Sequence, residues 1–280
     1  MKLGVVTDST ADLPAHILEE HDIRVVPTIL ALDGKEYVDG IDLTREEFYT
    51  RLPALRAAPS TAAPSIGDFS RAYESLLSQG CERILSIHPA AQLTSIINVA
   101  RQAAKDFSER IICVDSGSLS MGLGFQALAA AEHADGGIDS ALAAIESTRK
   151  RLQVKAALDT LEYLKRSGRV PKVVAALGGL ISLKPLIELL DGDVKPIGAA
   201  RTTRQADERM AQFLSQNGDL ERLAVLHTNA PQRAKTLLNA LMAQTPEHMP
   251  REILMVNVTA VIGTHLGPNG VGFAAIRKAL

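Results

Sequence analysis

The sequence has no tryptophan, few other aromatic residues and almost no cysteine. Aromatic residues make up 4% of the 280 positions, and the only cysteines are Cys81 and Cys113. So few aromatic side chains argue against the stacking platforms with which proteins hold single-stranded nucleic acid. Two cysteines among apolar neighbours favour buried, reduced thiols over a disulfide framework.

Neither sign of charge is in excess. The chain has 30 basic and 32 acidic residues and a formal net charge of −2, which argues against a basic nucleic-acid-binding face and against a polybasic membrane anchor. No apolar stretch reaches the ~20 residues of a spanning helix, and the first apolar run is too short for a signal peptide. We therefore expect a cytoplasmic protein with no nucleic-acid partner and no stable membrane insertion.

Local signatures of several enzyme classes are also missing. No Gly-x-x-x-x-Gly-Lys phosphate loop occurs, and Gly122-Leu123-Gly124 lacks the third glycine of a dinucleotide fingerprint. There is no His-Glu-x-x-His, no Cys-x-x-Cys and no Gly-x-Ser-x-Gly. The sequence predicts no metal site and no cofactor, and it favours a binding protein over an enzyme.

The chain is long for one core, so two domains are expected. Apolar runs typical of strands alternate with helical segments in the first half, which predicts a parallel sheet covered on both faces. The second half has adjacent strands around the turn Asp191-Gly192-Asp193 and fewer helices, which predicts a mixed sheet with helices on one face. The expected strands are residues 3–7, 24–30, 83–88, 111–115, 154–158, 185–190, 194–200, 223–228, 253–261 and 271–277.

These patterns predict an α/β protein: an N-terminal α/β/α parallel-sheet domain, residues 1–152, and a smaller C-terminal α/β domain with a mixed sheet, residues 153–280. Capping boxes at Thr44 and Ser65 predict helix starts in the first half. Residues 173–183 are apolar and contain glycine, and they fit no single element.

Three hydroxyl-rich segments follow strands or precede helices in the first half. Asp8 and Ser9 end the first strand, where α/β sheets bind ligands, although a capped turn is the commoner use of such residues. Thr61 lies in a stiff loop between two prolines, and Thr94 and Ser95 open a helix. Hydroxyl groups near a helix N-terminus suit a carboxylate, but each also fits helix capping.

The densest signal of the second half is residues 262–270, in which three glycines and a proline predict a shaped loop around Thr264 and His265. A histidine there can hydrogen-bond an anionic ligand or move a proton. Arg169 follows a Ser-Gly pair, and Arg201 lies between a strand and a helix. Either guanidinium matches a carboxylate or phosphate, although most arginines are simply solvated.

Taken together, these segments resemble the DegV family over nearly the whole chain. The resemblance is carried, in order, by VVTDST-ADLP, PSTAAPS-IGDF, VDS-GSLSMGLG, LEYLKRSGRV, LKPLIELLDGDV and IGTHLGPNGVG. It implies a two-domain fold with a long-chain fatty acid in an apolar tunnel in the cleft between the domains. It also implies a non-catalytic subunit of a fatty acid kinase, which presents the carboxylate to an ATP-binding partner protein that forms an acyl phosphate for phospholipid synthesis.

By the same resemblance, Thr61 and Thr94 bind the carboxylate, together with Ser95 and His265. Arg169, Arg201, Thr264, Asp8 and Ser9 match positions that face the ligand or the partner. The sequence departs from the usual family pattern at two pairs of alanines, Ala62-Ala63 and Ala90-Ala91, where polar residues are usual. Two alternatives stay open: a hydrolase or acyltransferase that uses a hydroxyl with His265 as its base, and a binding protein for another small anionic ligand.

Overall fold

The computed structural model describes residues 2–177, 183–244 and 246–279. The chain forms two compact units. Unit 1 comprises Met1–Ile29 and Thr61–Lys150, and unit 2 comprises Leu30–Ser60 and Arg151–Leu280. The predicted single boundary at residue 152 lies beside the crossing between Lys150 and Arg151, but it misses the segment Leu30–Ser60. With that segment, unit 2 contains more residues than unit 1 and is not the smaller part.

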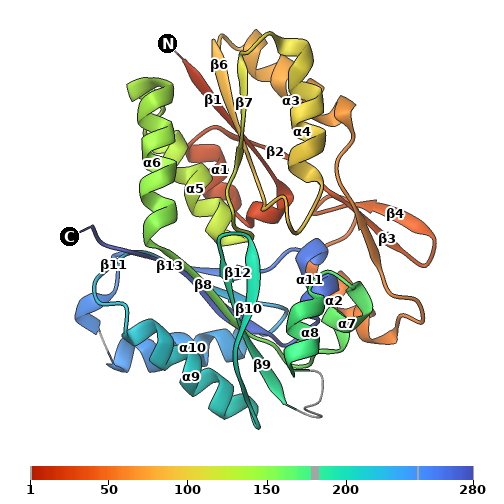
Figure 1. The fold of residues 1–280 in the computed structure, drawn as a ribbon, viewed down its shortest axis with the longest axis vertical. Coiled ribbons are helices and arrows are strands. Elements are labelled where there is room, and N and C mark those ends of the chain that lie inside the picture. Colours follow the sequence, from red (N-terminus) through yellow and green to blue (C-terminus); the bar gives the residue numbers. More distant parts are fainter. Residues whose placement is uncertain (1, 178–182, 245, 280) are drawn as a thin grey trace. The chain divides into compact units, whose positions relative to one another are not determined.

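Unit 1 is built on a four-stranded parallel sheet in the order β2-β1-β6-β7 (Figure 1). Its strands are β1 (Leu3–Asp8), β2 (Ile23–Val26), β6 (Arg83–His88) and β7 (Ile111–Asp115). Residues of β1 and β6 are almost entirely buried, which is typical of a parallel sheet covered by helices on both faces. This agrees with the α/β/α prediction for the first half.

Helices cover both faces of this sheet. The helices of unit 1 are α1 (Ala15–Glu20), α3 (Ile66–Ser78), α4 (Ile96–Ala104), α5 (Met121–Glu132) and α6 (Gly137–Arg151), together with the short 3-10 helices Ser9–Ala11, Lys105–Phe107 and Ala134–Gly136. α3 and α4 pack on the face that carries Val6 and Ile84, where Phe69 and Tyr73 fill the core. The capping box predicted at Ser65 is confirmed, because its side chain and that of Asp68 bond each other's backbone N–H groups.

Unit 2 contains a six-stranded mixed sheet in the order β10-β9-β8-β13-β11-β12. Its strands are β8 (Leu152–Ala157), β9 (Lys184–Leu190), β10 (Asp193–Ala200), β11 (Leu220–His227), β12 (Ile253–Asn257) and β13 (Val271–Arg277). Only β11 and β12 run parallel, and the other neighbours are antiparallel. Asp191 and Gly192 both adopt positive φ, as a tight hairpin turn between β9 and β10 requires. The predicted mixed sheet is therefore confirmed.

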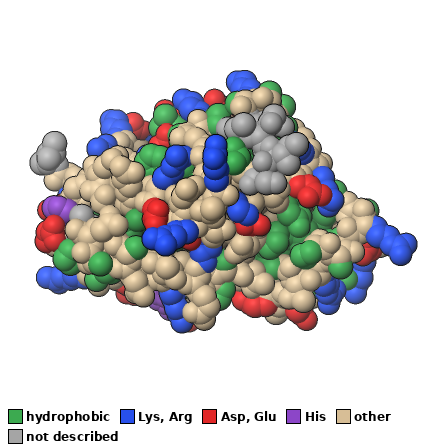
Figure 2. Space-filling view, turned by 90° about the horizontal axis from the view of Figure 1, so that it is seen from below, with side chains coloured by type: hydrophobic (Ala, Val, Ile, Leu, Met, Phe, Trp, Pro, Cys, Tyr) green, Lys and Arg blue, Asp and Glu red, His purple; other side chains and the backbone are tan. Residues whose placement is uncertain are grey.

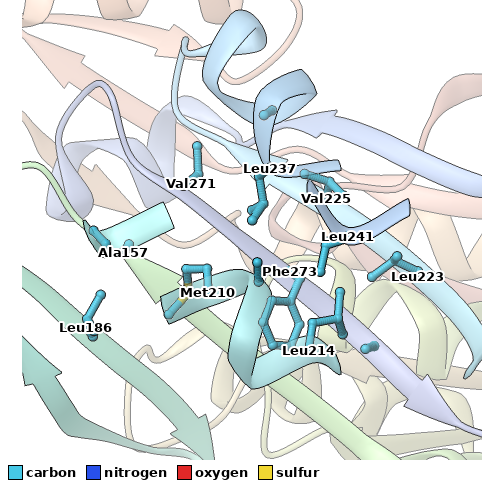
Figure 3. Packing of buried hydrophobic residues seen from close by; sticks show 14 of the residues in the cluster. Ala157, Leu186, Met210, Leu214, Leu223, Val225, Leu237, Leu241, Val271 and Phe273 are labelled. Atoms are coloured by element: carbon cyan, nitrogen blue, oxygen red, sulfur yellow. The ribbon is translucent and has the colours of Figure 1, made fainter. Parts of the chain in front are cut away.

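The core of unit 2 lies between this sheet and two helices, α9 (Thr203–Ser215) and α10 (Pro231–Gln244). Figure 3 shows Phe273 of the central strand β13 next to Met210 and Leu214 of α9. Phe273 and Met210 are fully buried. The other helices of unit 2 are α2 (Arg45–Arg51), α7 (Glu162–Ser167), α8 (Pro171–Leu177) and α11 (Ala260–Leu266), with 3-10 helices at Leu52–Ala54 and Pro246–His248.

The segment Leu30–Ser60 belongs to unit 2 through its own small sheet and α2. Strands β3 (Ile29–Leu32), β4 (Lys35–Val38) and β5 (Ser60–Ala62) form this sheet in the order β4-β3-β5. Phe48 of α2 is buried in a cluster with Leu30 and Ala260. Since Ala260 begins α11, the segment supports the helix that carries His265. The predicted capping box at Thr44 starts α2 as expected.

Two predicted strands differ from the structure. The expected strand at residues 24–30 is broken between β2 and β3, because Pro27 has no N–H group and the Thr28 N–H group donates to the Ser9 hydroxyl instead. The expected strand at residues 253–261 ends at Asn257. Residues 173–183, left unassigned, contain the end of α8, and residues 178–182 lie outside the described part of the chain.

Candidate functional site

At the carboxyl end of the unit 1 sheet, Asp8 and His88 form a fully buried pair. The register of β1 and β6 pairs Val6 with Ser86, which brings Asp8 opposite His88. Nδ1 of His88 lies 2.7 Å from Oδ2 of Asp8, and both side chains are 0% exposed. The other carboxylate oxygen accepts bonds from the N–H group (3.0 Å) and hydroxyl group (2.5 Å) of Thr10. Both carboxylate oxygens of Asp8 are thus bonded within the unit, so Asp8 does not face a ligand or a partner as the resemblance implied.

The expected ligand hydroxyls of unit 1 lie in two places. Thr61 is half-buried in β5, and its hydroxyl makes no hydrogen bond within the described residues. Thr94 and Ser95, predicted to open a helix, directly precede α4, which begins at Ile96. Ser95 makes no side-chain capping bond, so its exposed hydroxyl is available to a ligand, whereas the Thr94 hydroxyl accepts from the Ile96 N–H group over 3.4 Å.

Ser9 bonds within unit 1. Its hydroxyl oxygen lies 2.7 Å from that of Thr28 and accepts the Thr28 N–H group at 3.1 Å. These bonds connect the turn after β1 to Thr28, which follows the end of β2. The local structure therefore accounts for Ser9 as a turn residue, which is the commoner of the two uses that the sequence left open.

The glycine-rich segment before α5 serves close packing. The Ser120 hydroxyl donates to Asp12 Oδ2 over 2.6 Å, which joins the segment to the turn after β1. Ser120 and Asp12 both have positive φ. Within α5, a Cβ on Gly124 would lie 2.6 Å from the backbone oxygen of Ala11. Only glycine allows this approach, so Gly124 has a packing role in unit 1.

In unit 2, residues 262–266 of the predicted loop belong to helix α11, which ends at Leu266 and is capped by Gly267 with φ +75°; residues 267–270 form a loop as predicted. Gly263 lies inside this helix, where glycine is disfavoured by about 1 kcal/mol relative to alanine, and the pattern therefore predicted a loop. The structure gives the reason for the glycine: a Cβ at Gly263 would overlap the ring of Tyr49. One at Gly267 would overlap the ring of Tyr163.

His265 lies near the end of α11 with a buried, unpaired nitrogen. Its Nδ1 has no hydrogen-bond partner among the described residues. Burial, and secondly the charge of Arg169, lower the pKa of His265 to about 4. The ring is therefore neutral at pH 7, and it has one N–H donor and one acceptor. A buried polar atom without a partner is costly, which makes this ring a candidate contact for a polar ligand group.

Arg201 lines a hollow of about 600 Å³ in unit 2. Its lining includes Arg209, Glu208 and Gln205 as well as Leu183 and Ala200. The backbone N–H group of Arg201 donates to Gln205 over 3.1 Å, and the Arg201 side chain is exposed. The lining thus combines charged and amide side chains with apolar ones.

A family model described as "Uncharacterised protein, DegV family" matches residues 2–278. The chain belongs to the DegV family. Curated relatives include a DegV domain-containing protein of Streptomyces coelicolor, 33% identical with 96% of both chains covered. Another is a DegV domain-containing protein of Deinococcus radiodurans, 32% identical with 98% of both chains covered.

Two solved DegV structures are similar in fold to this chain over almost its full length. One, from Thermus thermophilus, is described as fatty acid binding of a DegV family protein; it has a TM-score of 0.91 and 31% identity, and covers 99% of this chain and 100% of that one. The other is DegV of Bacillus subtilis, described as a fatty acid binding protein, with a TM-score of 0.86, 28% identity and the same coverage. The predicted DegV-like α/β fold is therefore confirmed.

The geometry of this DegV chain does not support the alternative of a hydrolase based on His265. That reaction requires a nucleophilic hydroxyl within hydrogen-bond reach of the ring. The hydroxyl of the adjacent Thr264 donates to the Ala260 carbonyl group over 3.0 Å. Among the described residues, no serine or threonine hydroxyl bonds to His265.

The described surface of the DegV chain agrees with its balanced charge. Figure 2 shows basic, acidic and hydrophobic side chains interspersed on the face that it presents. Within the described residues, no group of three or more His, Cys, Asp or Glu side chains could hold a metal ion. No helix among those residues has the length and apolar character needed to cross a membrane.

Sequence reasoning missed the aromatic residues that shape this DegV site. Tyr49 and Tyr163 lie far in sequence from Gly263 and Gly267, against which they pack. The available signal was the glycine spacing in residues 262–270, which indicated close approach by some group without identifying it. The sequence also did not identify a partner for His88, which bonds Asp8 in the structure.

Proposed function

We propose that this protein binds one long-chain fatty acid and presents its carboxylate to an ATP-binding kinase partner for acyl-phosphate formation. The observation that carries the proposal is its full-length similarity to DegV structures described as fatty-acid-binding, above all the one from Thermus thermophilus. An acyl chain of about sixteen carbons gains roughly 0.8 kcal/mol per buried methylene, less the ordering costs. The acyl chain therefore supplies most of the binding affinity, and the carboxylate determines the orientation of the fatty acid.

The carboxylate needs hydrogen-bond donors, because an unpaired buried charge is very costly. In unit 1, the Thr61 and Ser95 hydroxyls are available, and the Thr94 hydroxyl can donate while it accepts from Ile96. In unit 2, the neutral His265 ring has one unpaired nitrogen. We assign Thr61, Thr94, Ser95 and His265 to the carboxylate. The alanine side chains at positions 62, 63, 90 and 91 offer the carboxylate no donor.

The exposed guanidinium groups of Arg169 and Arg201 suit a partner that carries phosphate. We assign them to the transfer step and not to holding the fatty acid. The chain has no phosphate loop of its own, so the nucleotide comes with the partner.

The test is lipid extraction from protein purified under native conditions, followed by mass spectrometry and by titration of delipidated protein with oleate and palmitate. We expect co-purified long-chain fatty acid and micromolar or tighter binding. Recovery of lipid-free protein that binds neither acid would overturn the proposal. Binding of a short anion such as acetate or phosphate in place of oleate would select the alternative of a small-anion binder.

The kinase step has a separate test. Fatty-acid-loaded protein, ATP and candidate kinases from the same cells are mixed, and acyl phosphate is trapped with hydroxylamine. Arg201→Ala is expected to keep oleate affinity within twofold and to reduce acyl-phosphate formation at least tenfold, with the exposed Arg204→Ala of α9 as a matched control. If both variants form acyl phosphate equally well, Arg201 has no role in the transfer step.

A further inference from the structure

A row of four hydrogen-bonded, buried side chains extends from the carboxyl end of the unit 1 sheet into its core. It begins with the Asp8–His88 pair and continues through Nε2 of His88, which lies 2.7 Å from the Ser86 hydroxyl oxygen. That oxygen lies 2.8 Å from the hydroxyl of Tyr73 in α3. All four residues are completely buried. Such a complete polar path through an apolar core is exceptional, because each member must find a partner there.

When the His88 ring is neutral, each hydrogen bond in this row of side chains is donated toward Asp8. An ionised Asp8 only accepts, so Nδ1 of His88 donates to it. Nε2 then accepts from the Ser86 hydroxyl, and Ser86 in turn accepts from Tyr73. Burial raises the pKa of Tyr73, so its hydroxyl keeps its proton. The ring of Phe69 meets that of His88 edge-on at 5.1 Å and fixes its plane.

The order carboxylate, imidazole, hydroxyl is that of a serine-hydrolase triad, but the site cannot work as one. Ser86 is completely buried, and Tyr73 occupies the remaining side of its hydroxyl. An attacking oxygen needs open space in front of it for the substrate carbonyl group. The structure therefore points to a brace that fixes its neighbours.

One end of the brace bonds to the turns that follow β6 and β7. His88 is the last residue of β6, and its carbonyl group accepts the Ser116 N–H group over 3.0 Å. Two residues on, the Ala90 carbonyl group accepts the N–H groups of Leu93 (2.9 Å) and Thr94 (3.3 Å). The position of Thr94 is thus set by a turn that leaves directly from His88.

We propose that His88 is a positioning residue for carboxylate recognition. Through its bonds to Asp8 and Ser86 it holds the turn that carries Thr94 and Ser95 in the geometry that receives the acid. This inference rests on the proposed fatty-acid function. It predicts that breaking the brace weakens recognition of the carboxylate and leaves recognition of the acyl chain nearly unchanged.

The experiment compares two ligands of equal length, oleate and oleyl alcohol, on the delipidated full chain. His88→Ala is expected to weaken oleate binding at least tenfold and oleyl alcohol binding less than twofold. His88→Asn, whose side-chain N–H group can reach Asp8 as Nδ1 does, is expected to recover a large part of the loss. A purely structural defect would weaken both ligands equally, and that result, or unchanged oleate affinity, would overturn the inference.

Tyr73→Phe provides a variant that keeps the buried ring and removes only the last hydroxyl of the brace. We expect a two- to fivefold loss for oleate and none for the alcohol, with Tyr37→Phe of β4 in unit 2 as the matched control. If Tyr73→Phe and Tyr37→Phe have the same ratio of oleate to oleyl alcohol affinity, the inference is overturned even if His88→Ala fails to fold. If the wild-type protein binds neither ligand, the proposed function itself fails. If it binds oleate but the ratio of oleate to oleyl alcohol affinity is the same in the variants, only the proposal about the brace fails.

Discussion

Tyr49 of α2 packs its ring directly against the α-carbon of Gly263 in α11, and its hydroxyl donates to the Val258 carbonyl group over 2.9 Å. The two residues are distant in sequence, yet this contact fixes where the helix with His265 begins and how close it comes to α2. It explains a glycine inside a helix, and it connects the inserted segment Leu30–Ser60 to the proposed site within unit 2.

The first prediction concerns this contact. Gly263→Ala places a methyl group inside the space of the Tyr49 ring, and overpacking of this kind typically costs about 1–3 kcal/mol. Chemical denaturation should show that loss of unfolding free energy. In a Tyr49→Leu background the same substitution should cost little, because the ring is gone and alanine favours the helix by about 1 kcal/mol. An equal loss in both backgrounds would contradict the contact.

A second prediction concerns Gly124 of α5. Gly124→Ala brings a methyl group against the backbone oxygen of Ala11, which cannot turn aside as a side chain can. We expect a loss of roughly 1–3 kcal/mol in unfolding free energy. Gly67→Ala is the matched control in α3, because a Cβ there meets Arg71 and Ser65 only at 3.4 and 3.7 Å. It should be neutral or slightly stabilising, and equal losses in the two variants would disprove the close approach.

The third prediction is a pH dependence of stability from His265. Its folded pKa of about 4 lies below the ordinary 6.5, so above pH 6.5 the ring is neutral in both states and proton uptake contributes nothing. As pH falls from 6.5 to about 4, the unfolded chain binds a proton that the folded ring does not. The free energy of unfolding then falls by up to about 1.4 kcal/mol per pH unit.

His265→Gln removes this contribution, so its stability should fall less steeply than that of the wild-type protein between pH 6.5 and 4. Denaturant titrations of the ligand-free proteins measure the difference. His227, whose pKa burial also lowers, contributes equally to both proteins and cancels in the comparison. Parallel curves for the two proteins would contradict the buried, neutral state of the His265 ring.

The fourth prediction concerns the hydroxyls. Thr61→Val and Thr94→Val keep side-chain shape and remove the donor, and a hydrogen bond to a charged group contributes about 1.5–3 kcal/mol. Each is expected to weaken oleate binding roughly tenfold or more, measured by titration calorimetry. Thr236→Val in α10 is the control, since its hydroxyl bonds only its own helix. If a valine variant binds oleate as tightly as the wild-type protein does, the substituted threonine is not part of the proposed site.

The Asp8–His88 pair shows how far sequence reasoning reaches. Period and turn signals predicted both strands, and parallel strands bring their carboxyl ends to one edge of the sheet. The sequence could not state that β1 and β6 are neighbours, because strand order depends on helix packing between distant segments. It therefore could not show that Asp8 bonds His88 and turns inward.

The sequence by itself determined the α/β class, the parallel sheet, the Asp191-Gly192 hairpin and both capping boxes. These follow from short-range periodicity and from side chains that bond their own backbone. Only the tertiary structure decided that Leu30–Ser60 joins unit 2, that residues 260–266 form a helix, and that Gly263 and Gly124 serve close packing. Each of these depends on contacts between segments far apart in the chain, whose free energy outweighs the local preference of glycine for loops.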